Sequence, residues 1–156
     1  MKLLMSALLG VCVGLSTAAG AQDVTWRKDV EPIIKAQCGE CHGSAEPEFS
    51  EWDVQRAKNK KLAPRMSTYD SLMGFVVWPA TGAFMRRLDD GKGSPGAKPG
   101  NMYRYLGETD EERGKNLATI KAWLGEGAWN LNRWEKRGDV PGITMEQIGK
   151  DIGDGA

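Results

Sequence analysis

Apolar residues recur at helical spacing along this 156-residue chain, most clearly in its second half. Leu117, Ile120 and Leu124 form one apolar stripe in a segment that opens with Thr109 and carries Glu112 three residues later. Thr at a helix N-cap followed by Glu at this spacing is a capping box, so the segment predicts an amphipathic helix. The glycines that follow Leu124 predict where this helix ends.

A short helix is predicted around residues 30–37. Val30, Ile33 and Ile34 recur at helical spacing, and Pro32 fits the first turn of the helix that they predict. This helix is expected to extend to Gln37.

Two more helices are predicted, over residues 67–77 and 81–88. Ser67 and Asp70 form a cap-like pair at the start of the first one. Residues 75–78 are the only candidate strand, and we interpret them as part of that helix. The fold is therefore predicted to be all-α, with loops at residues 43–49 and 89–100.

The first residues have the pattern of a secretory signal peptide. Lys2 gives a positive start, residues 3–15 are an apolar run too short to span a bilayer, and residues 19–21 match a small-x-small cleavage site. We expect cleavage after Ala21, export to the periplasm and no membrane span in the mature chain. The alternatives are an uncleaved anchor or a lipoprotein, although Cys12 follows a valine where a lipoprotein signal has a small residue.

Charge and length narrow the functional classes. The chain has 21 basic and 21 acidic residues, and removing the signal peptide with Lys2 leaves 20 against 21, a net charge of −1. Nucleic-acid-binding domains carry a marked basic excess, so this class is excluded. The remainder fits one domain, and the expected division is a signal peptide (1–21), a single folded domain (22–129) and a polar C-terminal tail (130–156).

The run Cys38-Gly39-Glu40-Cys41-His42 carries the most specific chemistry. A Cys-x-x-Cys-His motif attaches a c-type haem, because each thiol bonds one vinyl group and the histidine binds the iron. Zinc would need about four nitrogen or sulphur ligands, and the chain has no second cysteine pair and no second histidine. A redox dithiol would need a βαβ setting that these surroundings do not suggest. We expect one covalent haem c on Cys38 and Cys41, with His42 as an axial ligand.

The second axial ligand must be of another type, because His42 is the only histidine. Methionine, lysine, an oxygen donor and an open position remain. Met73 and Met85 lie in predicted helices, where methionine is more often core filler than ligand, and Met66 lies beside a cap and is expected at the surface. Met102 follows a Pro-Gly turn in a loop, which can bring its sulphur to the iron. The pattern favours Met102, with Met85 as the next candidate.

Three stretches together resemble the monohaem cytochromes c of class I. They are the run from Val30 through Pro32 to the haem motif and Gly43, the loop with Met102, and the closing segment Ile120-Lys121-Ala122-Trp123-Leu124-x-x-Gly127-Ala128. The resemblance covers about residues 28–128 and implies helices wrapped around one haem with His42 and Met102 as axial ligands. Tyr103 stands where many relatives have proline, and Pro47 is the candidate for the carbonyl that accepts the imidazole N–H.

A haem with protein ligands on both faces has no free position for a substrate. We therefore expect an electron-transfer protein rather than an enzyme, with other redox proteins as its partners. The alternatives are a haem subunit of a larger periplasmic oxidoreductase, docked by the tail, and a haem enzyme or gas sensor. In the last case the sixth position would be open or weakly held, for example by Lys92 or Lys98.

Other residues are predicted to surround the haem or to face solvent. Candidates for its apolar shell are Trp78, Phe84, Leu106, Leu117 and Trp123. Candidates for binding the propionates are Arg86, Arg87, Tyr103 and Arg104. A basic cluster, interpreted as a solvated face with a docking patch for an acidic partner as the alternative, consists of Arg56, Lys58, Lys60 and Lys61.

Overall fold

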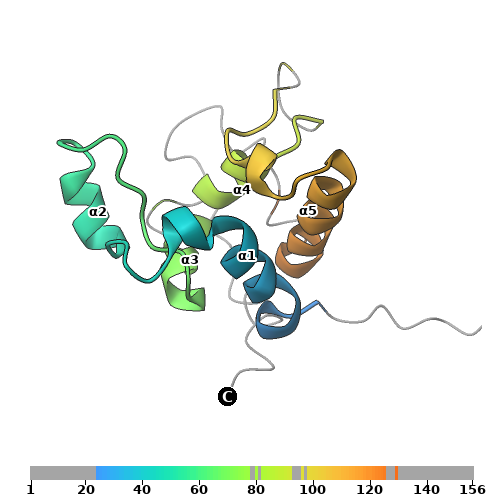
Figure 1. The fold of residues 1–156 in the computed structure, drawn as a ribbon, viewed down its shortest axis with the longest axis horizontal. Helices are drawn as coiled ribbons and strands as arrows, with labels where there is room; N and C mark the ends of the chain where they lie inside the picture. The colour runs from blue at the N-terminus through green and yellow to red at the C-terminus, as the bar shows by residue number, and fades with distance from the viewer. Residues whose placement is uncertain are drawn as a thin grey trace, which may run out of the picture.

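The computed structural model describes residues 24–77, 80, 82–92, 96, 98–125 and 129 (Figure 1). The regular elements in these ranges are the π-helical turn η1 (Trp26–Val30), α1 (Glu31–His42), α2 (Phe49–Gln55), α3 (Tyr69–Val76), α4 (Ala83–Leu88), the 3-10 helix η2 (Tyr103–Tyr105) and α5 (Asp110–Leu124). All of them are helical, which confirms the predicted all-α fold. The predicted signal peptide (1–21), the predicted tail (130–156) and Trp78 lie outside the described residues.

α1 carries the haem motif at its C-terminal end. η1 leads directly into it, and Pro32 lies in its first turn, where the missing N–H removes no helical hydrogen bond. The helix does not end at Gln37 as predicted but continues to His42. Residues three and four apart lie on one face of a helix, so Cys38, Cys41 and His42 share a face of α1.

α3 is capped by Thr68 and not by the predicted pair of Ser67 and Asp70. The Thr68 hydroxyl accepts a hydrogen bond from the N–H of Ser71, and the Ser71 hydroxyl accepts one from the N–H of Thr68, both at 3.2 Å. Serine here takes the place of the glutamate usual in a capping box. Residues 75–76, interpreted as helix rather than strand, lie in the last turn of α3.

α5 follows its prediction closely. The Thr109 hydroxyl accepts a hydrogen bond from the N–H of Glu112 (3.1 Å), and the Glu112 carboxylate accepts one from the N–H of Glu108 (2.9 Å). The three aliphatic side chains of the predicted stripe are buried. Gly125 ends the helix with a φ of 75°, a value that glycine adopts without strain.

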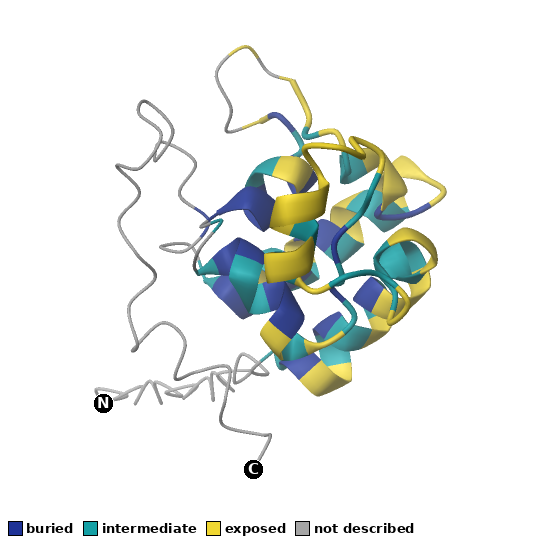
Figure 2. Cartoon of the chain, turned by 90° about the vertical axis from the view of Figure 1, so that its left-hand side faces the viewer, coloured by how far each residue is buried: buried dark blue, intermediate teal, exposed yellow. Residues whose placement is uncertain are grey.

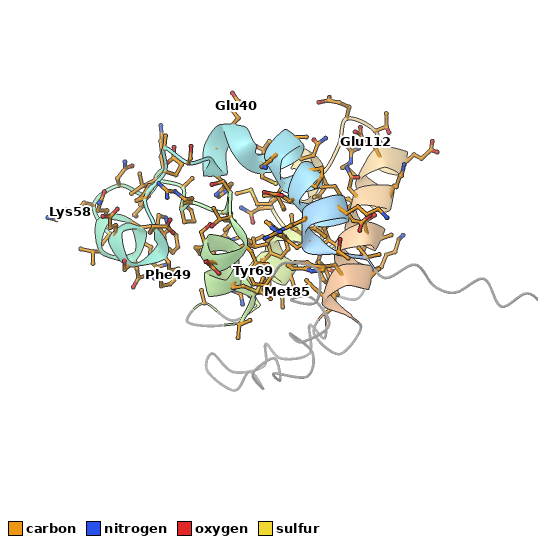
Figure 3. All side chains as sticks on the ribbon, turned by 90° about the horizontal axis from the view of Figure 1, so that it is seen from below. Glu40, Phe49, Lys58, Tyr69, Met85 and Glu112 are labelled. Carbon is orange, nitrogen blue, oxygen red and sulfur yellow. The ribbon has the colours of Figure 1, made fainter. Side chains whose placement is uncertain are left out.

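The core forms where η1 packs on α5 and α3 packs on α4. Trp26 of η1 contacts the rings of Trp123 in α5 and Tyr69 in α3, with centroids 5.5 and 5.8 Å apart. Buried residues lie on the inward faces of the helices, and exposed residues lie on their outer faces (Figure 2). Tyr69 and Met85 lie within the body of the molecule, whereas Glu40 points away from it (Figure 3).

α2 is a short helix that the sequence did not predict, and it lies at one end of the molecule, opposite α5 (Figure 1). Phe49 and Trp52 attach it to Phe75 of α3, with ring centroids 5.1 and 5.6 Å apart. The basic cluster that follows α2 is exposed, as predicted for a solvated face, and Lys58 lies at the outer edge (Figure 3). Among the described residues, no helix has the length and apolar character needed to cross a membrane.

Candidate haem site

His42 lies at the end of α1, and its ring is held by a backbone carbonyl. Its Nδ1 is 2.7 Å from the carbonyl oxygen of Pro64, 22 residues further along the chain. Because a carbonyl only accepts, Nδ1 carries the proton and Nε2 keeps its lone pair. This is the tautomer and orientation of an imidazole that binds a metal through Nε2.

Pro47, predicted to provide this carbonyl, does not contact the imidazole in this way. The carbonyl of Pro47 instead accepts a hydrogen bond from the N–H of Arg65 (2.8 Å). α2 separates Pro47 from Pro64 in the chain, and this helix gave no signal in the sequence. The acceptor therefore lies further from the haem motif than the prediction assumed.

The two cysteines of the motif form no disulfide with each other and lie in different surroundings. Cys38 packs against the hydrophobic core, whereas Cys41 is exposed. Burial raises the pKa of the Cys38 thiol to about 11, and the neighbouring Cys41 acts in the same direction. Cys38 therefore lies toward the core side of α1, and Cys41 lies toward its outer side.

The donor set fits a c-type haem better than a zinc ion. Within the described part of the chain, no three or more His, Cys, Asp and Glu side chains gather closely enough to hold a metal ion. Cys38, Cys41 and His42 therefore do not converge on one point, as zinc ligands must. Two thiols and an imidazole spread along one face of a helix match the separate attachment points of a porphyrin.

The four candidate methionines lie at different depths. Met85 and Met66 are buried, with 1% and 9% of their surface exposed, and Met73 and Met102 are half-buried against the core. Met66 is therefore not at the surface, which corrects the prediction for this residue. Met85 lies in α4, in a helix as predicted, and its role as the next candidate ligand stays untested. The axial role of Met102 stays a prediction.

The loop that carries Met102 lies directly on the end of α4. The N–H of Gly100 donates to the carbonyl of Asp89 (2.8 Å), and the N–H of Met102 donates to the carbonyl of Arg87 (2.9 Å). A Cβ added to Gly100 would lie 2.3 Å from the carbonyl oxygens of Arg86 and Arg87. Only glycine permits this approach, so Gly100 fixes where Met102 stands.

The described members of the predicted apolar shell are all buried: Phe84, Leu106, Leu117 and Trp123. The predicted propionate donors already take part in contacts within the protein. Arg87 donates to Asn101 (3.1 Å), and Arg104 donates to the hydroxyl of Tyr105 (2.7 Å) while lying over its ring. Of the other two, Tyr103 packs against the core and Arg86 is half-buried. The lysines weighed as ligands, Lys92 and Lys98, are exposed.

In the described residues, the helices surround one Cys-x-x-Cys-His motif, which defines the class of the cytochromes c, and comparison with known proteins agrees. The chain belongs to the PccH cytochrome c family, whose model matches residues 25–151. This match begins just after the predicted cleavage site and extends well into the segment predicted as a tail. A search of curated proteins finds no match.

A solved structure gives a more specific comparison. The chain is similar to the monohaem cytochrome PccH from Geobacter sulfurreducens, with 47% sequence identity and a TM-score of 0.64. The similarity covers 83% of this chain and 97% of that chain. The identification of a monohaem cytochrome c from the sequence is thereby confirmed.

Proposed function

We propose that this protein is an exported c-type cytochrome that carries single electrons between redox proteins. Cys38 and Cys41 hold one haem through thioether bonds, and His42 and Met102 are the axial ligands of its iron. The haem supplies a one-electron Fe(III)/Fe(II) couple when it is bound. The similarity to a monohaem cytochrome supports the proposal at the level of the family.

The observation that carries the proposal is the hydrogen bond between His42 Nδ1 and the Pro64 carbonyl. It fixes the tautomer and leaves the lone pair of Nε2 to bind the iron. The helical spacing of α1 places His42 on the same face as both cysteines. A half-buried imidazole with an oriented Nε2 has the features of a proximal ligand.

Ligation by Met102 makes the site suited to electron transfer and not to catalysis. A thioether is a neutral, weak donor that raises the reduction potential relative to a second imidazole. The buried residues around the site favour the ferrous state in the same direction, because burial disfavours the more highly charged ferric form. With both axial positions filled by the protein, no position remains for a substrate.

Export follows from the predicted signal peptide at residues 1–21, which would place the protein in the periplasm. With Cys12 removed, the mature chain would have only the two motif cysteines. Covalent haem would then provide the cross-link that disulfides provide in other exported proteins. The partners would be other redox proteins of that compartment.

Two measurements on the purified protein test the proposal. After denaturation in acid and extraction with organic solvent, the pigment should stay with the polypeptide, because thioether bonds survive this treatment. The ferric protein should show the weak red absorption band of sulphur bound to haem iron, and the ferrous protein should not bind CO at neutral pH. A pigment that is extracted would exclude covalent attachment, and ready CO binding would favour an enzyme or gas sensor.

A further inference from the structure

The Pro64 carbonyl that orients His42 is itself held from the opposite side. This carbonyl and the N–H of Arg65 belong to the same peptide unit, and that N–H donates to the carbonyl of Pro47 at 2.8 Å. A planar trans peptide unit points its C=O and N–H in opposite directions, so fixing one of them fixes the other. The unit thus bridges Pro47 and the imidazole of His42.

The side chain of Arg65 fastens the loop from which Pro47 comes. Its Nε donates to the carbonyl of Glu46 (3.1 Å), one terminal nitrogen donates to the carboxylate of Glu48 (2.7 Å), and the other donates to the carbonyl of Ser44. A guanidinium presents its donors in a rigid plane and can meet three acceptors in fixed directions, which an ammonium group cannot do. Residues 44–48 are therefore wrapped around one side chain.

The hydrogen bonds from Arg65 to two backbone carbonyls hold this loop more firmly than its ion pair with Glu48. The Arg65 and Glu48 side chains are 30% and 48% exposed, and pairs in such positions contribute little to stability because water screens them. The bonds to the carbonyls of Ser44 and Glu46 instead hold the backbone that leads into Pro47. A further bond, from the N–H of Met66 to the carbonyl of His42 (3.0 Å), joins the two ends of the segment between these residues.

We propose that Arg65 is a positioning residue for the proximal imidazole and that it lowers the reduction potential of the haem. The inference rests on the proposed ligation of the iron by His42. A hydrogen bond from Nδ1 makes Nε2 a stronger donor, which favours the ferric state. Bonds in a chain polarise one another, so the Pro47 contact strengthens the acceptor that His42 meets.

The test replaces Arg65 by lysine, which keeps the positive charge but loses the planar set of donors. We expect the Nδ1 proton of His42 to exchange with D2O about tenfold faster, because the Pro64 carbonyl is held less firmly. The reduction potential should shift upward. Exchange is followed by NMR of the ferrous protein, and the potential is measured by spectroelectrochemical titration.

Two further variants separate geometry from charge. Arg56→Lys is the matched control, because Arg56 also belongs to an ion pair, with Asp53 (2.8 Å), and its guanidinium lies over the ring of Trp52. Glu48→Gln removes the ion pair of Arg65 but leaves both carbonyl contacts. Both variants should keep the wild-type exchange rate of the His42 proton.

The outcomes distinguish this inference from the proposed function. A normal low-spin haem spectrum with unchanged exchange and potential in Arg65→Lys would overturn the role of Arg65 alone. Equal acceleration in Arg65→Lys and Arg56→Lys would also overturn it, because the effect would then be a general loosening. Absence of ring-current-shifted His42 signals from the NMR spectrum of the ferrous wild-type protein would instead overturn the ligation by His42.

Discussion

The segments that carry the two predicted axial ligands are held in different ways. On the side of His42, the chain is tied down by the Pro64 carbonyl, by a bridging peptide unit and by the guanidinium of Arg65. On the side of Met102, the loop rests on α4 through two backbone hydrogen bonds and the close fit of Gly100. The histidine side therefore has a polar network of several side-chain and backbone bonds, whereas the methionine side is held mainly by backbone contacts with α4, with a further bond from Arg87 to Asn101. We expect the sulphur to leave the iron before the imidazole does.

Removing both attachment points of the haem should unfold the segments of both axial ligands. In the double variant Cys38→Ser/Cys41→Ser, we expect a largely unfolded chain, because a buried porphyrin of several hundred Å² contributes about 10 kcal/mol at ~25 cal/mol per Å². This is comparable to the whole net stability of a typical domain, ~5–15 kcal/mol. Thermal unfolding followed by far-UV circular dichroism checks it, and a cooperative transition without haem would contradict it.

Removing the sulphur of Met102 should open one axial position of the iron and leave the ligation by His42 intact. In Met102→Ala the ferric sulphur band should vanish, the ferrous protein should bind CO, and the potential should fall because a weak donor that favours Fe(II) is lost. The control is Met85→Leu, a volume-conserving change at a fully buried position that should cost less than about 1.5 kcal/mol and keep the band. If Met85→Leu lost the band and Met102→Ala kept it, Met85 would be the axial ligand and Met102 would not.

A smaller change should weaken the methionine side without removing its sulphur. In Gly100→Ala, the added Cβ would meet the carbonyls of Arg86 and Arg87 at 2.3 Å, so the loop has to move away from α4. We expect a destabilisation of about 1–3 kcal/mol and CO binding between that of wild type and Met102→Ala. Optical titration of the ferrous protein with CO measures it.

Gly114→Ala is the matched control for this change. Gly114 lies in α5, and a Cβ there meets nothing within 4 Å. This variant should gain about 0.5–1 kcal/mol of stability, because alanine loses less backbone entropy in a helix than glycine. If both glycine variants bound CO equally, the fit of Gly100 would not be what holds Met102.

The smallest effect is expected away from both ligands, at the cap of α5. Thr109→Ala removes the hydroxyl that accepts the N–H of Glu112 and should cost about 1 kcal/mol. Urea unfolding of the holoprotein measures this loss. The spectrum and the potential should match those of wild type, and a shift in either would show that α5 influences the iron directly.

Features that depend on neighbouring residues were predictable from the sequence. The haem motif and the cap and buried stripe of α5 each lie within one short segment, where spacing alone carries the information. The same reasoning misplaced the cap of α3, because Thr68 and Ser67 are equally good caps by residue type and only the backbone decides between them.

Features that depend on distant segments were not predictable. The partner of His42 was assigned to Pro47, because nothing in residues 49–55 has the periodicity of a buried helix and α2 contains no buried residue. Met66 is buried because the chain turns back there and brings Pro64 to His42. No nearby residue signals this turn, and Met66 was therefore expected at the surface. The role of Arg65 had no local signal, because its acceptors on residues 44–48 are mostly main-chain oxygens.

The oxygen that meets the imidazole belongs to the main chain at position 64, and this limits how such a cytochrome can be retuned. A scan that replaces one side chain after another leaves that atom in place every time, so no single replacement in it removes this contact directly. Adjustment of the iron must come from residues that steer the path of the backbone. Variation among related chains in how residues 44–48 are secured would then track their redox behaviour more closely than variation at the proline itself.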